Sequence, residues 1–186
     1  MKHIATLTLM LHFGVLGIYA DPGPVNITVS GSSARSTTSL GGTPAGEYQL
    51  DGDGTLGPLT VRVLSTGMTA PQISTICSGP TKVYFASKAG AAVFRFQDGG
   101  LLTGILTGGG DCVDFAAGAA LCTRIFQVIG GSGRFTNASG TLTLTMTVVP
   151  VLADGSPTNP VFFAVTGGVT GNLAGVAADQ VSQDGQ

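Results

Sequence analysis

The sequence contains no tryptophan, only two histidines, and few charges: Asp, Glu, Lys and Arg make up 10% of its 186 residues. Both histidines, His3 and His12, lie in the N-terminal apolar segment. Beyond that segment the chain has no imidazole, which excludes a Ser-His-Asp relay, a Cys-His relay and a histidine-bound zinc ion. The sequence therefore predicts no catalytic residue, no cofactor-binding residue and no metal ligand.

The N-terminus has the pattern of a secretory signal peptide. A basic start is followed by a largely apolar stretch of about 15 residues from Ile4 to Ile18, and Ala20 precedes the polar Asp21. A membrane span needs about 20 apolar residues, which makes a single-span anchor the weaker alternative. We therefore predict a signal peptide over 1–20, cleaved near Ala20, and a single extracytoplasmic domain over 21–186 with no membrane span after cleavage.

Cleavage would also remove Lys2, leaving seven basic residues against ten acidic ones, a formal charge of −3. Scattered basic residues on a weakly acidic chain form no stripe for phosphate backbones, so no nucleic-acid partner is predicted. Hydrophobic residues still make up 43% of the chain, and glycine occurs 30 times. This composition is typical of an all-β domain with tight turns.

Strand periodicity supports that fold class. The clearest case is Thr141–Val149, where threonines alternate with apolar residues as in a half-buried strand. Further strands are predicted at 58–65, 92–97, 101–106, 120–129 and 161–170, with weaker candidates at 25–30 and 81–87. About eight strands with short links predict a single antiparallel β-barrel, with a β-sandwich as the alternative. The small-residue and polar segments 31–46 and 176–186 are expected to be loosely ordered.

The stretch GGSGRFTNASG at 130–140 resembles a phosphate-binding loop but lacks its key features. A phosphate-binding loop needs Lys and then a helix after its last glycine, whereas here Arg-Phe and then a strand follow. We interpret the stretch as a corner between two strands, in which glycines provide the backbone geometry, Phe135 plugs the core and Arg134 is solvated. The structural residues of this corner are Gly130, Gly131, Gly133, Phe135 and Gly140.

Three cysteines leave an odd number for an oxidising compartment. If 116–118 forms a three-residue hairpin loop, Cys112 faces Cys122 across the hairpin, close enough for a disulfide. Cys77 would then be left over. A bridge from Cys77 to either partner and three reduced thiols remain the alternatives.

The corner motif resembles the GGTGRFxxAxG corner of dirigent-like and allene-oxide-cyclase-like β-barrels. It is closest to exported bacterial proteins of unknown role, which often carry a hairpin resembling VFRFQDGGLLTG at 93–104. The resemblance covers about residues 92–150 and implies an antiparallel barrel of about eight strands. It transfers no catalytic residue, because the corner is a structural element.

Three acid-base candidates remain: the Glu47-Tyr48 pair, Asp111 and Asp114. Arg95 and Arg124 lie within apolar strands. If they faced inward they would pair with these carboxylates, but we expect these charges on the barrel exterior.

Three functions fit these observations. The first is an exported, non-catalytic barrel that binds an apolar small molecule or serves as a surface or matrix component. The second is a cyclase-like or dirigent-like barrel that steers a reactive apolar intermediate by shape, which requires little acid-base machinery. The third is a homo-oligomeric structural module. An inward cluster of Glu47, Tyr48 or Arg124 around an apolar cavity would favour the second, and a filled lumen would favour the third.

Overall fold

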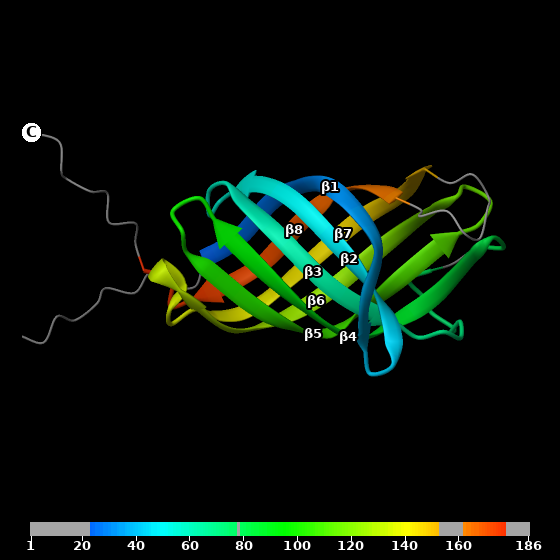
Figure 1. The fold of residues 1–186 in the computed structure, drawn as a ribbon, viewed down its shortest axis with the longest axis horizontal. Helices are drawn as coiled ribbons and strands as arrows, with labels where there is room; N and C mark the ends of the chain where they lie inside the picture. The colour runs from blue at the N-terminus through cyan, green and yellow to red at the C-terminus, as the bar shows by residue number, and fades with distance from the viewer. Residues whose placement is uncertain (1–22, 78, 153–161, 178–186) are drawn as a thin grey trace, which may run out of the picture.

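A computed structural model describes residues 23–77, 79–152 and 162–177, so the predicted signal peptide lies outside the described residues. Eight antiparallel strands follow one another around a closed barrel, and the first pairs with the last (Figure 1). The strands are β1 (Gly23–Leu40), β2 (Thr43–Gly54), β3 (Leu59–Gly67), β4 (Lys82–Phe96), β5 (Leu101–Asp114), β6 (Ala119–Ser132), β7 (Ser139–Leu152) and β8 (Phe162–Ala174), with a 3-10 turn η1 (Gly133–Phe135) after β6. The prediction of an all-β antiparallel barrel is confirmed.

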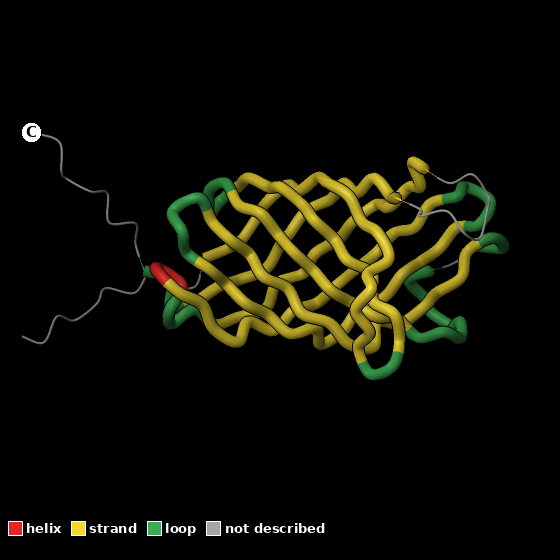
Figure 2. Tube along the Cα trace, in the orientation of Figure 1, coloured by secondary structure: helices red, strands yellow, loops and turns green. Residues whose placement is uncertain are grey.

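The barrel has two distinct ends, because successive turns alternate between them (Figure 2). The β2–β3, β4–β5 and β6–β7 connections, with η1, form what we call the corner end. The β1–β2, β3–β4 and β5–β6 connections lie at the opposite end, which we call the pocket end. In the described part of the chain, no helix is long and apolar enough to cross a membrane.

Strand β7 follows the predicted alternation. Leu142, Leu144 and Met146 are fully buried in the lumen, while the threonines between them face outward. Each strand hydrogen-bonds to two neighbours, so the closed sheet has no exposed edge.

The prediction that 31–46 is loosely ordered is wrong. β1 continues to Leu40, and β2 returns from Thr43 after a turn in which Gly41 and Gly42 have positive φ. Small and polar residues carry no apolar periodicity here, but the backbone still pairs, for example Gly31 with Leu50. Tyr48 and Leu50 then anchor β2 in the core.

Strand β5 contains a bulge that reverses which side chains face the lumen. The register with β6 shifts between Leu106 and Gly108. Before the bulge, Leu102 and Leu106 pack into the core; after it, Asp111 pairs with the inward-facing Cys122. Gly109 has φ +106, and a Cβ there would collide with the carbonyl of Thr123, so the bulge requires glycine.

The length of the β5–β6 turn explains why the predicted Cys112–Cys122 disulfide is wrong, because the loop spans 115–118 and not 116–118. The structure instead bonds Cys77 to Cys112, and Cys122 is a buried free thiol. In the hairpin Asp114 pairs with Ala119 and Cys112 with Leu121, one residue away from the predicted register. A shift of one residue turns a side chain to the other face of the sheet, which places Cys112 outside and Cys122 inside.

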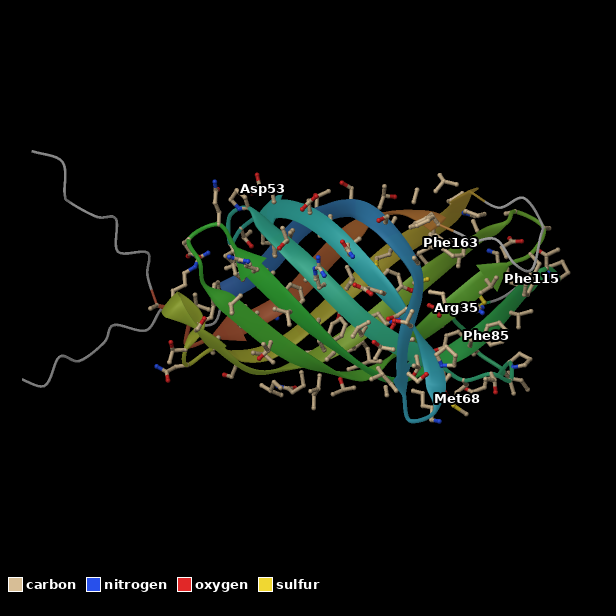
Figure 3. The ribbon with its side chains drawn as sticks, viewed as in Figure 1. Arg35, Asp53, Met68, Phe85, Phe115 and Phe163 are labelled. Atoms are coloured by element: carbon tan, nitrogen blue, oxygen red, sulfur yellow. A yellow bond between two sulfur atoms is a disulfide. The ribbon has the colours of Figure 1, made fainter. Side chains whose placement is uncertain are left out.

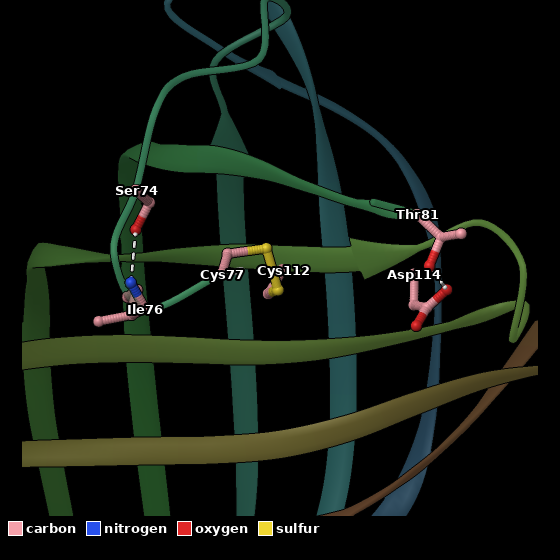
Figure 4. The surroundings of a disulfide bond; sticks show 6 residues. All are labelled: Ser74, Ile76, Cys77, Thr81, Cys112 and Asp114. Atoms are coloured by element: carbon pink, nitrogen blue, oxygen red, sulfur yellow. Dashed lines mark hydrogen bonds between the residues drawn. A yellow bond between two sulfur atoms is a disulfide. The ribbon is translucent and has the colours of Figure 1, made fainter. Parts of the chain in front are cut away.

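The disulfide fastens the long β3–β4 connection to the outside of β5 (Figure 4). Near it, Thr81 donates a hydrogen bond to Asp114 Oδ1 at 2.9 Å, which ties the end of the same connection to the end of β5. A structural disulfide indicates folding in an oxidising compartment.

The corner end is plugged by aromatic side chains. Phe135 is completely buried, and its ring stacks on Phe96 with centroids 4.3 Å apart. Gly133 has φ +61 at the reversal, and a Cβ on Gly131 would overlap Phe135 and the carbonyl of Leu101. Gly130 and Gly140, near the facing ends of β6 and β7, also have positive φ. The glycines thus let Phe135 enter the end of the lumen.

Arg134 is not the solvated residue expected from the sequence. Its Nε lies 2.9 Å from Asp98 Oδ2, and its guanidinium lies over the rings of Phe96 and Phe135. It also donates a hydrogen bond to the carbonyl of Leu56. Arg134 therefore joins all three connections of the corner end.

Candidate functional site

A pocket of about 430 Å³ opens at the pocket end of the barrel. Its volume falls in the range of small-molecule sites. Its apolar lining residues are Ala34, Val113, Phe115, Ala119, Ala120, Val148, Pro150 and Phe163. Figure 3 places Phe115, Phe163 and Arg35 at this end. The lumen is thus filled at the corner end and hollow at the pocket end.

The polar lining residues are Ser33, Arg35, Tyr48, Asp111, Asp114 and Cys122. Neighbouring strands bring three of them together: β2 supplies Tyr48, β5 supplies Asp111 after its bulge, and β6 supplies Cys122 as the partner of Asp111. We call Tyr48, Asp111 and Cys122 the polar floor of the pocket.

Arg124 lies behind the polar floor and holds it in place. Its side chain is buried, and its Nη1 lies 2.7 Å from Asp111 Oδ1. Nη2 donates a hydrogen bond to the Tyr48 hydroxyl at 3.2 Å, and Nε donates one to Ser65 Oγ at 3.1 Å. Nη1 also donates to the carbonyl of Thr123 at 3.0 Å. A buried guanidinium with partners on all three nitrogens is a fixed element of the fold.

The polar floor and Arg124 together carry no net charge. Burial raises the pKa of Tyr48 well above its usual value, although the Arg124 charge opposes this shift. Burial, reinforced by Asp111, likewise raises the pKa of the Cys122 thiol. Burial alone would lower the pKa of Arg124, but interactions with Tyr48 and Asp111 outweigh it and raise that pKa. At neutral pH the phenol and thiol therefore keep their protons, and the Arg124 charge is balanced by Asp111.

This arrangement suits hydrogen bonding to a bound molecule better than nucleophilic attack. A thiol reacts as its thiolate, which a raised pKa disfavours. The Tyr48 hydroxyl accepts from Arg124 and still has its own proton to donate. The Asp111 side chain is 25% exposed, so its carboxylate remains accessible as an acceptor. A ligand hydroxyl or carbonyl has the complementary hydrogen-bonding groups.

The other sequence candidates lie elsewhere. Arg95 is exposed on the outside of β4, as expected. Glu47 lies 3.8 Å from Arg62 Nη1, an ion pair on the outer surface. Asp114 lies at the pocket rim, where hydrogen bonds from the backbone of Ala117 and the side chain of Thr81 lower its pKa. Of the predicted acid-base groups, only Tyr48, Asp111 and Arg124 come together in the lumen, and Arg124 and Asp111 correct the expectation that these charges are external.

Comparison with known proteins adds little to this description. No family model and no curated protein matches the chain. Among solved structures, a pterocarpan synthase dirigent protein aligns with 90% of this chain and 99% of its own, at 14% identity and a TM-score of 0.17. A TM-score this low does not establish a shared fold. The eight-stranded barrel is established by its own strand pairing.

Proposed function

We propose that this protein is an exported barrel that binds an apolar small molecule carrying a hydroxyl or carbonyl group. One observation carries the proposal: an apolar pocket whose polar floor is held and neutralised by a buried arginine. The apolar walls favour an apolar body, while Tyr48 and Asp111 orient a single polar group. The floor and Arg124 together carry no net charge, and Arg35 and Asp114, which also line the pocket, are of opposite sign.

Export is supported by the signal-peptide pattern and by the disulfide between Cys77 and Cys112. Expressed with its N-terminus intact in a secreting host, the chain should appear outside the cell with its first residue at or near Asp21. N-terminal sequencing measures this directly. Recovery of soluble cytoplasmic protein that retains Met1 would reject export.

Filling the pocket should abolish ligand binding. Ala120 lines the pocket between Val113 and Val148, its partners in the sheet, so Ala120→Phe places a ring where the ligand body would lie. We expect the affinity for a phenylnaphthylamine dye, followed by its fluorescence, to fall by about tenfold or more. Ala164→Phe is the matched control, because Ala164 is exposed next to Phe163 and does not line the pocket.

The polar floor is tested with a pair of ligands that differ in one hydroxyl. The wild type should prefer naphthol to naphthalene, and Tyr48→Phe should remove most of that preference, because a net hydrogen bond contributes about 1 kcal/mol.

The pocket-filling experiment can also reject the pocket as a ligand site. Equal effects of Ala120→Phe and Ala164→Phe on dye affinity, or no dye binding by the wild type, would do so.

A second candidate, a barrel that steers a reactive apolar intermediate, is favoured by the same floor, since Tyr48 lines an apolar cavity and Arg124 hydrogen-bonds to its hydroxyl. It uses the same pocket and differs in that the bound molecule reacts there. Enantiomeric excess among the products of such an intermediate distinguishes the two functions, because simple storage leaves the products racemic.

A further inference from the structure

Exposed apolar side chains are concentrated at the pocket end. Eight of the eleven large hydrophobic residues exposed in the described part of the chain lie there, and three lie toward the corner end. The eight are Met68, Ile73, Ile76, Phe115, Leu121, Val149, Val151 and Phe162, and the three are Val93, Ile105 and Ile129. Concentrated exposure of this kind marks an interaction surface.

These side chains lie on separate elements of the pocket end, and Phe115 also lines the pocket. Ile73 and Ile76 come from the β3–β4 connection, and Phe115 from the β5–β6 turn. Val151 and Phe162 lie at the facing ends of β7 and β8. Figure 3 shows Phe115 at this end of the barrel and Met68 on its side, near the β1–β2 turn. Apolar residues on separate projecting connections can each insert into a lipid surface. A protein partner would instead require a flat, continuous area.

The charges of the described residues are distributed unequally between the two ends. Arg35, Lys82 and Lys88 lie in the pocket half, where Asp114 is the acidic residue at the rim. The corner half carries Arg95 and Arg134 against Asp51, Asp53 and Asp98. Glu47 and Arg62 pair with each other and cancel. Among the described residues, the pocket end is therefore the more positive end, which complements anionic headgroups.

We propose that the pocket end docks on an anionic phospholipid surface, with the apolar rim inserted among the lipids and the pocket facing them. An apolar ligand then passes between membrane and pocket without crossing water. This purpose rests on the proposed ligand-binding function, whereas docking itself depends only on the rim.

Vesicle sedimentation tests the rim directly. Purified protein should sediment with vesicles of equal parts phosphatidylcholine and phosphatidylglycerol, and less with phosphatidylcholine alone. Ile73→Ser combined with Ile76→Ser should lower the partition coefficient by about tenfold or more, since each loses an apolar side chain from the lipid. Neither residue lines the pocket, so dye binding in solution should be retained.

The matched control combines Ile105→Ser with Ile129→Ser, which removes the same side chains from exposed positions toward the corner end. This variant should bind vesicles as the wild type does. Docking is overturned if the wild type stays in the supernatant or if both double variants lose binding equally. It is also overturned if light scattering shows a wild-type oligomer that Ile73→Ser with Ile76→Ser dissociates, because a second copy then covers the rim. Dye binding without vesicle binding would reject docking alone, and vesicle binding without dye binding would reject the ligand pocket alone.

Discussion

Asp111→Asn should lower the free energy of unfolding by about 3 kcal/mol, because it leaves the buried Arg124 guanidinium without its counter-charge. Arg124 is 3% exposed, and Asp111 is the carboxylate 2.7 Å from its Nη1. Asn has nearly the same shape as Asp, so the pocket outline is preserved while the charge is lost. Urea denaturation of the two proteins measures the difference.

Glu47→Gln provides the matched control, since it breaks the surface ion pair with Arg62, whose side chain is 68% exposed. Its effect should stay below about 1 kcal/mol, as for other exposed pairs. Combining Asp111→Asn with Arg124→Met should recover most of the lost stability, because the unpaired buried charge is then gone. If Asp111→Asn and Glu47→Gln are indistinguishable, the ion pair behind the pocket does not hold the polar floor.

Removing the disulfide should have an effect of similar size. Cys77 and Cys112 are 35 residues apart, and closing a loop of that length restricts the unfolded chain by about 4 kcal/mol in the chain-entropy model. Cys77→Ser combined with Cys112→Ser should lower the unfolding free energy by nearly that amount, and reduction of the wild type should produce the same loss.

The third cysteine supplies the control for this experiment. Cys122→Ala keeps the bond, so its stability should still fall on reduction. Peptide mapping under non-reducing conditions should recover a Cys77–Cys112 link from this variant and from the wild type. Recovery of Cys112 linked to Cys122 would show that the hairpin has the register first expected from the sequence.

Much of the barrel could be predicted because several strands are strongly patterned. The threonine alternation in β7 and the Asp-Gly-Gly turn before β5 each have a local physical cause that operates in any fold. Strand β2 was missed because its order depends on pairing with β1 and β3, distant partners that add no local signal.

The polar floor could not be predicted because the sequence does not show which face of β5 and of β6 points into the lumen. In β6, Arg124 and Phe126 lie on one face and Leu121 and Ile129 on the other, so both faces contain apolar residues. An arginine in such a strand is more often external, and only the closed lumen shows that it points inward. The inward position of Asp111 depends on the β5 bulge. The three consecutive glycines at 108–110 allow a bulge, but they do not show at which residue it occurs.

The β5 bulge also gives this segment one residue of slack. Thr107 is the unpaired residue of the bulge, and the pairs on either side of it, Leu106 with Phe126 and Gly108 with Ile125, use adjacent residues of β6. Deleting Thr107 would therefore join these pairs into a regular ladder, and Asp111 would still pair with the inward-facing Cys122. A single-codon deletion here would thus spare the ligand-binding interior, whereas in a regular strand it would turn every later side chain to the other face of the sheet.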